Sequence, residues 1–396
     1  MRLSTSAAFT LQASIILCFL AGSSAPTPLY AVYQAAWGFS PITITVVFGI
    51  YAVAVLGSLL VVGSLSDYIG RRPVLVAATL VQVVAMLVFA TAHGLGALLA
   101  ARIIQGLSTG AAVAAVGAGL LDLDRAKGTV ANSIAPMLGT AIGALLSGLL
   151  VRYLPAPTAL VYLVLGAIFL VQAAGVVVMP ESVTRRPGAL ASLRPQFQVP
   201  PQLRAAMLLA APALVASWAL AGFYGSIGPA VARRLAGSTS PVLGGLTLFV
   251  LAASGAAAVL VTRRYAARTV LVVGTGAIVA GTAVSLIAIA MTSVPVFFLG
   301  LVVAGAGFGT TFQGAIRTIV PLAAARERAG VLSVLYVIAY LSMGVPAVIG
   351  GFRFVHGGGV ITTAQEYAVA VMVLAGFALV GALLRAPAPA AQPGTP

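Results

Sequence analysis

Charge is the scarcest feature of this sequence. Only 7% of the 396 residues are charged, and acidic residues number six. A soluble domain carries about 25% charged residues, so the composition excludes a soluble globular protein. Hydrophobic residues make up 61% of the chain, and the mean hydropathy is +1.13. The chain is therefore predicted to lie in a membrane.

The chain also lacks the residues of an enzyme or a metal site. Cys18 is the single cysteine and lies in the first apolar segment, so no disulfide framework can form. The sequence has no cluster of His, Cys and Glu, no Walker phosphate loop, and no Ser with a His base in the same bundle. We therefore expect no enzymatic activity, no metal and no cofactor.

Long apolar segments run through the whole chain instead. A helix that spans a bilayer needs roughly 20 apolar residues, because backbone polar groups in lipid must be paired within the helix. At about 33 residues per span and loop, this length accommodates twelve helices. The predicted spans are residues 8–33, 42–64, 74–92, 96–120, 129–151, 158–179, 205–231, 241–261, 270–291, 295–319, 330–353 and 363–384. The predicted fold class is an all-α membrane protein with these 12 transmembrane helices.

The net charge of +15 is distributed unevenly between the two sides of the predicted spans. With the N-terminus inside, most Lys and Arg residues fall in the inner loops, whereas Arg152, Arg233, Arg234 and Arg353 fall in the outer ones. Such a bias places both termini in the cytoplasm and explains the basic balance without a nucleic-acid partner. The high Ala, Gly and Arg content is typical of a bacterial sequence. The predicted location is therefore the bacterial cytoplasmic (inner) membrane, which the chain crosses many times.

The N-terminal segment allows one alternative. Arg2, the apolar run from Ala13 to Leu20 and the small residues Ser23 to Ala25 also match the pattern of a secretory signal peptide. Removal of such a signal would leave eleven spans and would invert the charge bias of the later loops. We interpret the segment as the first membrane helix.

A weak internal repeat divides the chain near its midpoint. Ser40 and Ser240 open corresponding spans 200 residues apart, and Gly128 and Gly330 precede corresponding spans 202 residues apart. A near-constant offset predicts two pseudo-symmetric bundles of six helices each. The predicted organisation is an N-terminal bundle over 1–179, a cytoplasmic linker over 180–204, a C-terminal bundle over 205–385 and a flexible cytoplasmic tail over 386–396.

Three motifs resemble those of a known family. Residues 63–72, GSLSDYIGRR, match the signature of the major facilitator superfamily: glycine, any, leucine, small, aspartate, any two, glycine and two bases. Residues 101–110, ARIIQGLSTG, are similar to the fourth-helix motif of that family. Residues 139–148 resemble the fifth-helix motif of its bacterial drug and multidrug exporters, with Ala144 where those usually have Pro. The resemblance covers nearly the whole chain and implies the twelve-helix fold of these transporters.

The first motif places one acid and two bases in a tight turn. Asp67 has several candidate partners, namely Arg71, Arg72, Arg125 and the positive N-terminus of the helix that begins near Gly330. The resemblance implies that the last contact crosses between the halves and acts as a latch of the outward-open state. The alternative is an ordinary turn with positive-inside anchoring. The predicted latch residues are Gly63, Asp67, Gly70, Arg71 and Arg72, with Arg125 as a candidate partner.

The fourth span carries a costly charge. Arg102 lies about a turn and a half inside the span, where an Arg costs about 2.5–3.5 kcal/mol on insertion scales. Helical spacing puts Gln105 and Thr109 on the same face. Family resemblance implies a gating or proton-coupling role for these three residues, whereas the alternative is that Arg102 snorkels to the outer surface. The predicted helix-packing residues are Gly106, Gly110, Gly139, Gly143 and Ser147.

A carrier of two six-helix bundles has its site at mid-membrane, between the first and fourth helices of each half. The predicted substrate-cavity residues are Ser24, Thr27, Tyr30, Trp218, Tyr224, Thr310, Gln313, Tyr336 and Tyr340. Together they predict a mostly neutral pocket of aromatic and hydroxyl side chains, which suits an amphiphilic molecule.

The acids leave the coupling mechanism open. Five of the six map to the cytoplasmic side, and only Glu366 enters a span, near its outer start. Proton coupling would have to use Arg102 with a displaced proton carrier, the substrate, or Glu366. The predicted function is a secondary active transporter that exports a small hydrophobic or amphiphilic molecule by alternating access, with protons as the coupling ion. The alternatives are an uptake carrier or facilitator for a sugar, organic acid or other neutral or anionic metabolite, and a membrane sensor without transport. The expected partners are the substrate and the lipid bilayer, and the chain is expected to be a monomer.

Overall fold

The computed structural model describes residues 3–197, 199–324 and 327–384, and it is built from helices, with no strand among these residues. Twelve helical segments are long and apolar enough to cross a membrane, as predicted. The tail predicted over 386–396 lies outside the described residues. The elements are α1 (Thr5–Ser24), α2 (Pro26–Trp37), α3 (Pro41–Val62), α4 (Ser66–Ile69), α5 (Arg71–Ala90), α6 (Leu95–Leu123), α7 (Arg125–Tyr153), α8 (Leu160–Val177), α9 (Ala189–Ser192), α10 (Pro201–Ser226), α11 (Gly228–Ala236), α12 (Pro241–Thr262), α13 (Ala267–Ala290), α14 (Val294–Ile319), a 3-10 turn (Val320–Leu322), α15 (Arg328–His356) and α16 (Gly359–Leu384).

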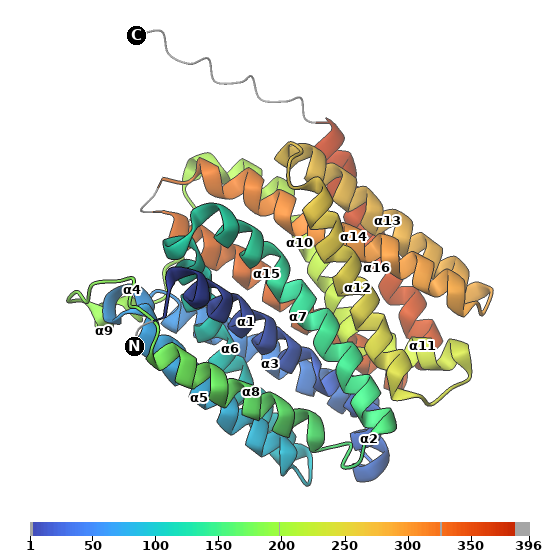
Figure 1. Ribbon diagram of the computed structural model, residues 1–396. Coiled ribbons are helices and arrows are strands. Elements are labelled where there is room, and N and C mark those ends of the chain that lie inside the picture. The colour runs from blue at the N-terminus through green and yellow to red at the C-terminus, as the bar shows by residue number, and fades with distance from the viewer. Residues whose placement is uncertain (1–2, 198, 325–326, 385–396) are drawn as a thin grey trace.

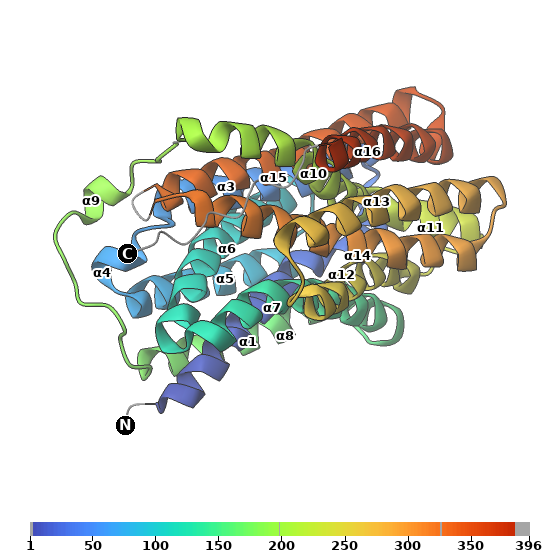
Figure 2. The same ribbon diagram turned by 90° about the horizontal axis from the view of Figure 1, so that it is seen from above.

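The long helices run roughly along one direction between two faces of the molecule (Figures 1 and 2). We call the end at which α1 begins and α16 ends the terminal face, and the opposite end the distal face. The short helices α4 and α9 lie at the terminal face, whereas α2 and α11 lie toward the distal face. Helices α1 to α8 pack mainly on one another, and so do α10 to α16. The two groups meet where α7 packs along α12 and where α3 packs along α15.

Two predicted spans are broken in corresponding places. The first span divides at Ala25, between α1 and α2, and the seventh divides at Ile227, between α10 and α11. Proline near the start of each second piece cannot donate a backbone hydrogen bond to the preceding turn. Both second pieces then end at a glycine with a left-handed backbone, Gly38 at φ +67° and Gly237 at φ +57°. The shared break repeats one architecture in the two halves.

Small residues allow the helices around the centre to approach closely. A Cβ atom at Gly106 would lie 2.8 Å from the carbonyl oxygen of Tyr51, so α6 packs directly on the backbone of α3. At Gly143 a Cβ atom would collide with the backbone of α1 at Ala21. Ser147 Oγ donates to the Ala25 carbonyl oxygen at 2.6 Å, which provides a partner for a carbonyl at the α1–α2 break. The other predicted packing residues behave in the same way, Gly110 against α3 and Gly139 against α1.

Candidate functional site

A cavity of about 510 Å³ lies between the two groups of helices. Its walls come from α1, α2, α3, α6, α7, α10, α12, α14 and α15. On α7 the lining residues run from Thr129 to Thr140, in the half of the helix nearest the terminal face. On α14 they run from Phe308 to Arg317, again near the terminal face. The cavity therefore extends from the middle of the molecule toward the terminal face.

Six of the nine residues predicted for the cavity line it. They come from five helices, α1, α2, α10, α14 and α15, and are far apart in the chain. These residues are Ser24, Thr27, Trp218, Gln313, Tyr336 and Tyr340. Helical pairing between the halves thus brings together polar and aromatic groups that lie more than three hundred positions apart in the sequence, as Ser24 and Tyr340 do.

The other three predicted residues, Tyr30, Tyr224 and Thr310, are buried and do not line the cavity. The hydroxyl of Tyr30 accepts a hydrogen bond from Arg102 Nε at 3.1 Å. The hydroxyls of Tyr224 and Ser285 lie 3.0 Å apart. Thr310 Oγ1 donates to the Ala306 carbonyl oxygen of its own helix at 2.6 Å. Each residue is on a predicted helix but on a face turned toward a neighbouring helix.

Aromatic side chains form one wall of the cavity. The ring of Trp218 lies 5.2 Å from that of Phe312 and 5.1 Å from that of Tyr340, measured between centroids. Phe308 lies 6.2 Å from Trp218 on the same side. Trp218 Nε1 is buried and has no hydrogen-bond partner among the described residues. We call these four residues the aromatic wall, and they offer ring faces and one free donor to a bound molecule.

The cavity also has lining residues that the sequence analysis missed. Phe48 and Tyr51 lie three positions apart on α3, and Asn132 and Thr140 lie on α7. The helical spacing of Phe48 and Tyr51 was visible in the sequence. The prediction used the first and fourth helices of each half and span eleven, and it left out spans two and five. In the structure α3 and α7 reach the cavity by packing on α15 and α12.

Arg102 is fully enclosed inside the N-terminal half, with 1% of its surface exposed. Its Nη1 atom donates to the Ser23 carbonyl oxygen at 2.8 Å and to Gln105 Oε1 at 2.7 Å. Its other nitrogens donate to the hydroxyl of Tyr30. The guanidinium carbon lies 5.1 Å from the ring centroid of Tyr51, which lines the cavity. The alternative of a snorkelling Arg102 is therefore wrong.

The buried guanidinium has no carboxylate partner in the described part of the chain. Carbonyl oxygens, a phenol and aromatic rings carry its charge instead, and Gln105 is held in turn by the Gly22 carbonyl oxygen at 2.9 Å. The hydroxyl of Thr109 donates to the Gln105 carbonyl oxygen at 2.7 Å, and Thr109 interacts with Tyr51 and not with the guanidinium itself. Arg102 therefore ties α6 to the end of α1 beside the helix break.

A charged cluster lies at the terminal face of the N-terminal half. Arg71 is buried and forms an ion pair with Asp67. Its Nε atom also donates to Asp122 Oδ2 at 3.1 Å, and its Nη1 atom donates to Ser66 Oγ at 2.7 Å. Of the candidate partners of Asp67, the described structure pairs it with Arg71, and no ion pair of Asp67 with Arg72 or Arg125 occurs among the described residues. One arginine thus joins the α4 turn to the end of α6.

Glu181, just after α8, completes this cluster. Its carboxylate accepts from the backbone N–H of Arg71 at 2.8 Å and of Arg72 at 3.0 Å, which caps the N-terminus of α5. Gly70 precedes them with φ +104°, and a Cβ atom there would lie 2.5 Å from Glu181 Oε2. Gly70 is thus required both by its backbone and by the carboxylate. Gly63 is similarly restricted, because a Cβ atom would meet the Leu59 carbonyl oxygen.

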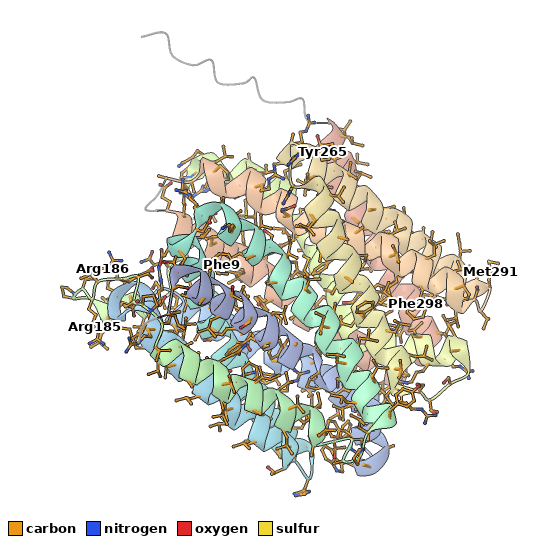
Figure 3. The ribbon with its side chains drawn as sticks, in the orientation of Figure 1. Phe9, Arg185, Arg186, Tyr265, Met291 and Phe298 are labelled. Carbon is orange, nitrogen blue, oxygen red and sulfur yellow. The ribbon has the colours of Figure 1, made fainter. Side chains whose placement is uncertain are left out.

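The predicted linker is docked on the same surface. Arg186 donates from its backbone N–H to the Tyr68 carbonyl oxygen at 3.0 Å, and its guanidinium carbon lies 4.6 Å from the Tyr68 ring centroid. Its Nε atom donates to the Asp67 carbonyl oxygen at 3.1 Å, and Ser64 Oγ donates to the Ser192 carbonyl oxygen at 3.0 Å. Figure 3 shows Arg185 and Arg186 at this end of the molecule. The linker therefore braces the turn that carries the first motif.

A family model described as Major Facilitator Superfamily matches residues 13–347, which is most of the chain. The chain belongs to the major facilitator superfamily. No curated protein matches it. Among solved structures, it is similar to the nucleoside transporter NupG, with 11% identity and a TM-score of 0.69, over 96% of this chain and 98% of the other. It is similar also to the human organic anion transporter MFSD10 (TETRAN), with 18% identity and a TM-score of 0.69, over 96% of this chain and 100% of the other.

The major facilitator signature explains part of what sequence reasoning found. It singled out Asp67, Gly70 and Arg71, which meet in the charged cluster. The signature does not include Asp122 or Glu181. Each of these acids lies more than fifty residues from Arg71 along the chain. The acid after span six and the acid ending span four were visible in the sequence. Only the fold places both beside the same arginine.

Proposed function

We propose that the protein is a secondary active transporter that exports a small hydrophobic or amphiphilic molecule by alternating access. The observation that carries this proposal is the cavity of about 510 Å³ between the two groups of helices, with its aromatic wall. Such a cavity fits an amphiphilic molecule, which places its apolar part on the rings. The names of the two similar structures, a nucleoside transporter and an organic anion transporter, support a small organic cargo.

The direction of opening supports the first step of export. The loops at the terminal face carry most of the arginines, which favours the cytoplasm on that side and both termini within it. A cavity open toward the terminal face would therefore take its cargo from the cytoplasm. The proposed membrane is the bacterial cytoplasmic membrane, and the proposed units are the bundles 1–179 and 205–385 joined by the linker 180–204.

The charged cluster is proposed to act as a latch. With the cavity open toward the terminal face, the side-chain contacts of Asp67 are within its own half, to Arg71. In the opposite conformation the start of α15 would come closer, and Asp67 would then face the positive end of that helix. The exchange of partners would stabilise the outward-open state. Arg71 would keep Asp122 engaged in both states.

Proton coupling is proposed to involve the Arg102 network or the substrate. Glu366 is paired with Arg353 at 2.6 Å near the distal face and does not line the cavity, which argues against it as the carrier. Arg102 contacts both the α1–α2 break and the cavity residue Tyr51. A movement of the break, or of Tyr51 when cargo binds, would therefore alter the contacts of Arg102. If cargo binding displaces a side chain of this network from Arg102 and that side chain takes up a proton, proton binding and cargo binding become thermodynamically coupled.

Flux in proteoliposomes tests the proposal. Purified protein is reconstituted with an imposed pH gradient and a panel of labelled amphiphiles, sugars and organic acids. We expect concentrative movement of an amphiphile that collapses when an ionophore dissipates the gradient, and a strong loss in Trp218→Ala, which removes the aromatic wall. Flux of a sugar or organic acid that persists without a gradient would support a facilitator instead. A complete absence of substrate-dependent flux would favour a sensor.

A further inference from the structure

A second hollow of about 380 Å³ adjoins the cavity at the terminal face. It lies between α7, α12 and α14. Three arginines line it, Arg263, Arg264 and Arg317, and we call them the basic rim. The residues that line both spaces are Thr129, Ser133, Val259, Gln313 and Arg317. The basic rim is therefore the mouth of the same cavity that carries the aromatic wall.

Arg317 is held in position at this mouth. Its Nη2 atom donates to the Tyr265 carbonyl oxygen at 2.7 Å, from the turn between α12 and α13. Figure 3 shows Tyr265 at the terminal face and Met291, at the other end of α13, at the distal face. Arg317 Nη1 is buried and has no partner among the described residues, and neither has Gln313 Oε1 one turn earlier. The guanidinium is thus fixed on one side and unsatisfied on the other.

The acids of the described chain are all engaged elsewhere. None of them lines the cavity or its mouth. Asp67 and Asp122 bind Arg71, Asp124 caps α7, Glu181 caps α5, Glu327 accepts from the Ala324 N–H and Glu366 binds Arg353. Arg102, enclosed beside Tyr51, adds a further positive charge near the inner part of the cavity. The cavity therefore has positive charge at its mouth and beside its wall, with no negative charge facing either.

Anchoring of the chain at the membrane surface does not explain Arg317. An anchoring arginine extends toward headgroups or water. Arg317 instead lies against both hollow spaces, with one nitrogen bonded to backbone and one buried without a partner. Arg263 and Arg264 are exposed and fit the anchoring explanation alone, so the inference depends on Arg317.

We propose that Arg317 binds the anionic group of an amphiphilic substrate whose apolar part rests on the aromatic wall. The inference rests on the proposed transport function and names its substrate class as organic anions. A guanidinium binds carboxylate, sulfonate or phosphate oxygens through paired N–H donors. Phe312 and Arg317 are five residues apart on α14, about 7.5 Å along the helix axis. A two-ring aromatic body with a charged group at one end spans this separation. Anionic lipid headgroups share the chemistry and are the competing source.

Matched aromatic probes test the inference. The full chain is placed in nanodiscs of zwitterionic lipid, and binding of 2-naphthalenesulfonate and of 2-naphthyltrimethylammonium is measured by calorimetry. We expect the sulfonate to bind at least about tenfold more tightly, because the charged groups at and beside the cavity are arginines. Arg317→Gln should reduce sulfonate affinity about tenfold, and Arg317→Lys should give an intermediate value. Arg204→Gln removes the same charge at the same face outside both linings and should change nothing.

The outcomes separate this inference from the proposed function. Equal binding of the two probes, no binding of either, or sulfonate binding unchanged in a folded Arg317→Gln protein overturns it. Nanodiscs that contain phosphatidylglycerol test the competing source, anionic lipid headgroups. If the sulfonate binds in zwitterionic nanodiscs but not in these, Arg317 is assigned to headgroups and the inference is overturned. Selective sulfonate binding that depends on Arg317, without flux in proteoliposomes, supports the site while contradicting transport. Thermal melting of each variant establishes that it is folded.

Discussion

The turn between the second and third spans differs from its counterpart in the second half in how its arginines are neutralised. In the N-terminal half, Arg71 lies between two carboxylates, and Glu181 caps the helix that it begins. In the C-terminal half, the turn after α12 carries Arg263 and Arg264 at the cavity mouth, with no acid in either lining. The first turn is closed on itself, whereas the second presents charge to the cavity.

This difference shows how a duplicated scaffold acquires two surfaces. The neighbouring helices α6 and α14 occupy matching places in the repeat, yet one supplies Asp122 to its turn and the other supplies Arg317. Arg317 binds the backbone of the C-terminal turn at the Tyr265 carbonyl oxygen, where the N-terminal turn uses carboxylates. Rigidity is thus obtained on one side with an ion-pair cluster and on the other with main-chain bonds. Only the second arrangement leaves a buried guanidinium nitrogen, Nη1 of Arg317, without a partner among the described residues.

The largest effect is expected from removal of the central arginine of the N-terminal cluster. Arg71→Gln leaves Asp67 and Asp122 without their cation. Breaking a buried pair costs about 3–5 kcal/mol, but these carboxylates are 39% and 32% exposed, so we expect a loss of about 2 kcal/mol. Denaturant unfolding in mixed micelles measures it. Arg72→Gln is the matched control, since the side chain of Arg72 reaches only the Met179 carbonyl oxygen at 3.5 Å in the described structure. Equal losses in both variants would contradict a specific role for Arg71.

A smaller effect is expected from neutralising Asp67. If the proposed latch operates, Asp67→Asn weakens the outward-open state and lowers flux about tenfold, which corresponds to about 1.4 kcal/mol. Binding from the terminal side should be retained. Labelling of Ser24→Cys in a Cys18→Ser background, by an impermeant maleimide added at the distal side, reports the outward state. Unchanged labelling together with unchanged flux would contradict the latch.

The sequence predicted the spans closely because their signal is composition. The span expected at 42–64 is Pro41–Val62, and that expected at 74–92 begins with the signature arginines at Arg71–Ala90. It could not predict which face of a helix meets the cavity. An apolar helix is hydrophobic all round in a membrane, so periodicity does not separate lipid-facing from buried sides. Tyr224 and Thr310 therefore lie on the predicted helices, but their hydroxyls bond within the protein and they do not line the cavity.

Long-range pairing was equally inaccessible from the sequence. Glu181 caps α5 from 110 positions away, and Ser147 binds the Ala25 carbonyl oxygen from 122 positions away. Neither contact has a local pattern. The break at Ala25 could have been anticipated from Pro26 and Pro28, whereas its satisfaction by Ser147 depends on α1 and α7 packing through Gly139. Propensity predicts the break, and tertiary contacts determine what stabilises it.

The smallest effect concerns the caps of corresponding helices, α7 and α15. Asp124 accepts from the N–H groups of Ala126 and Lys127 at 3.0 Å each, whereas Glu327 at the start of α15 makes no such cap bond. The backbone N–H of Lys127, with its ammonium group nearby, lowers the pKa of Asp124 below 3.8. Its stabilising contribution is therefore complete above pH 3.8 and disappears as the pH falls through the lower folded-state value.

Melting of wild type and Asp124→Asn across this range measures the contribution of that carboxylate. Asn keeps a capping oxygen but does not titrate, so the wild type should be slightly more stable at neutral pH, and the difference should vanish in acid. Glu327→Gln is the matched control on α15, where the N-cap side chain makes no cap bond, and we expect a smaller loss of stability there than in Asp124→Asn. If the stability difference between wild type and Asp124→Asn grew on acidification, the assigned direction of the pKa shift would be wrong. If Glu327→Gln lost as much stability as Asp124→Asn, the starts of α7 and α15 would not differ.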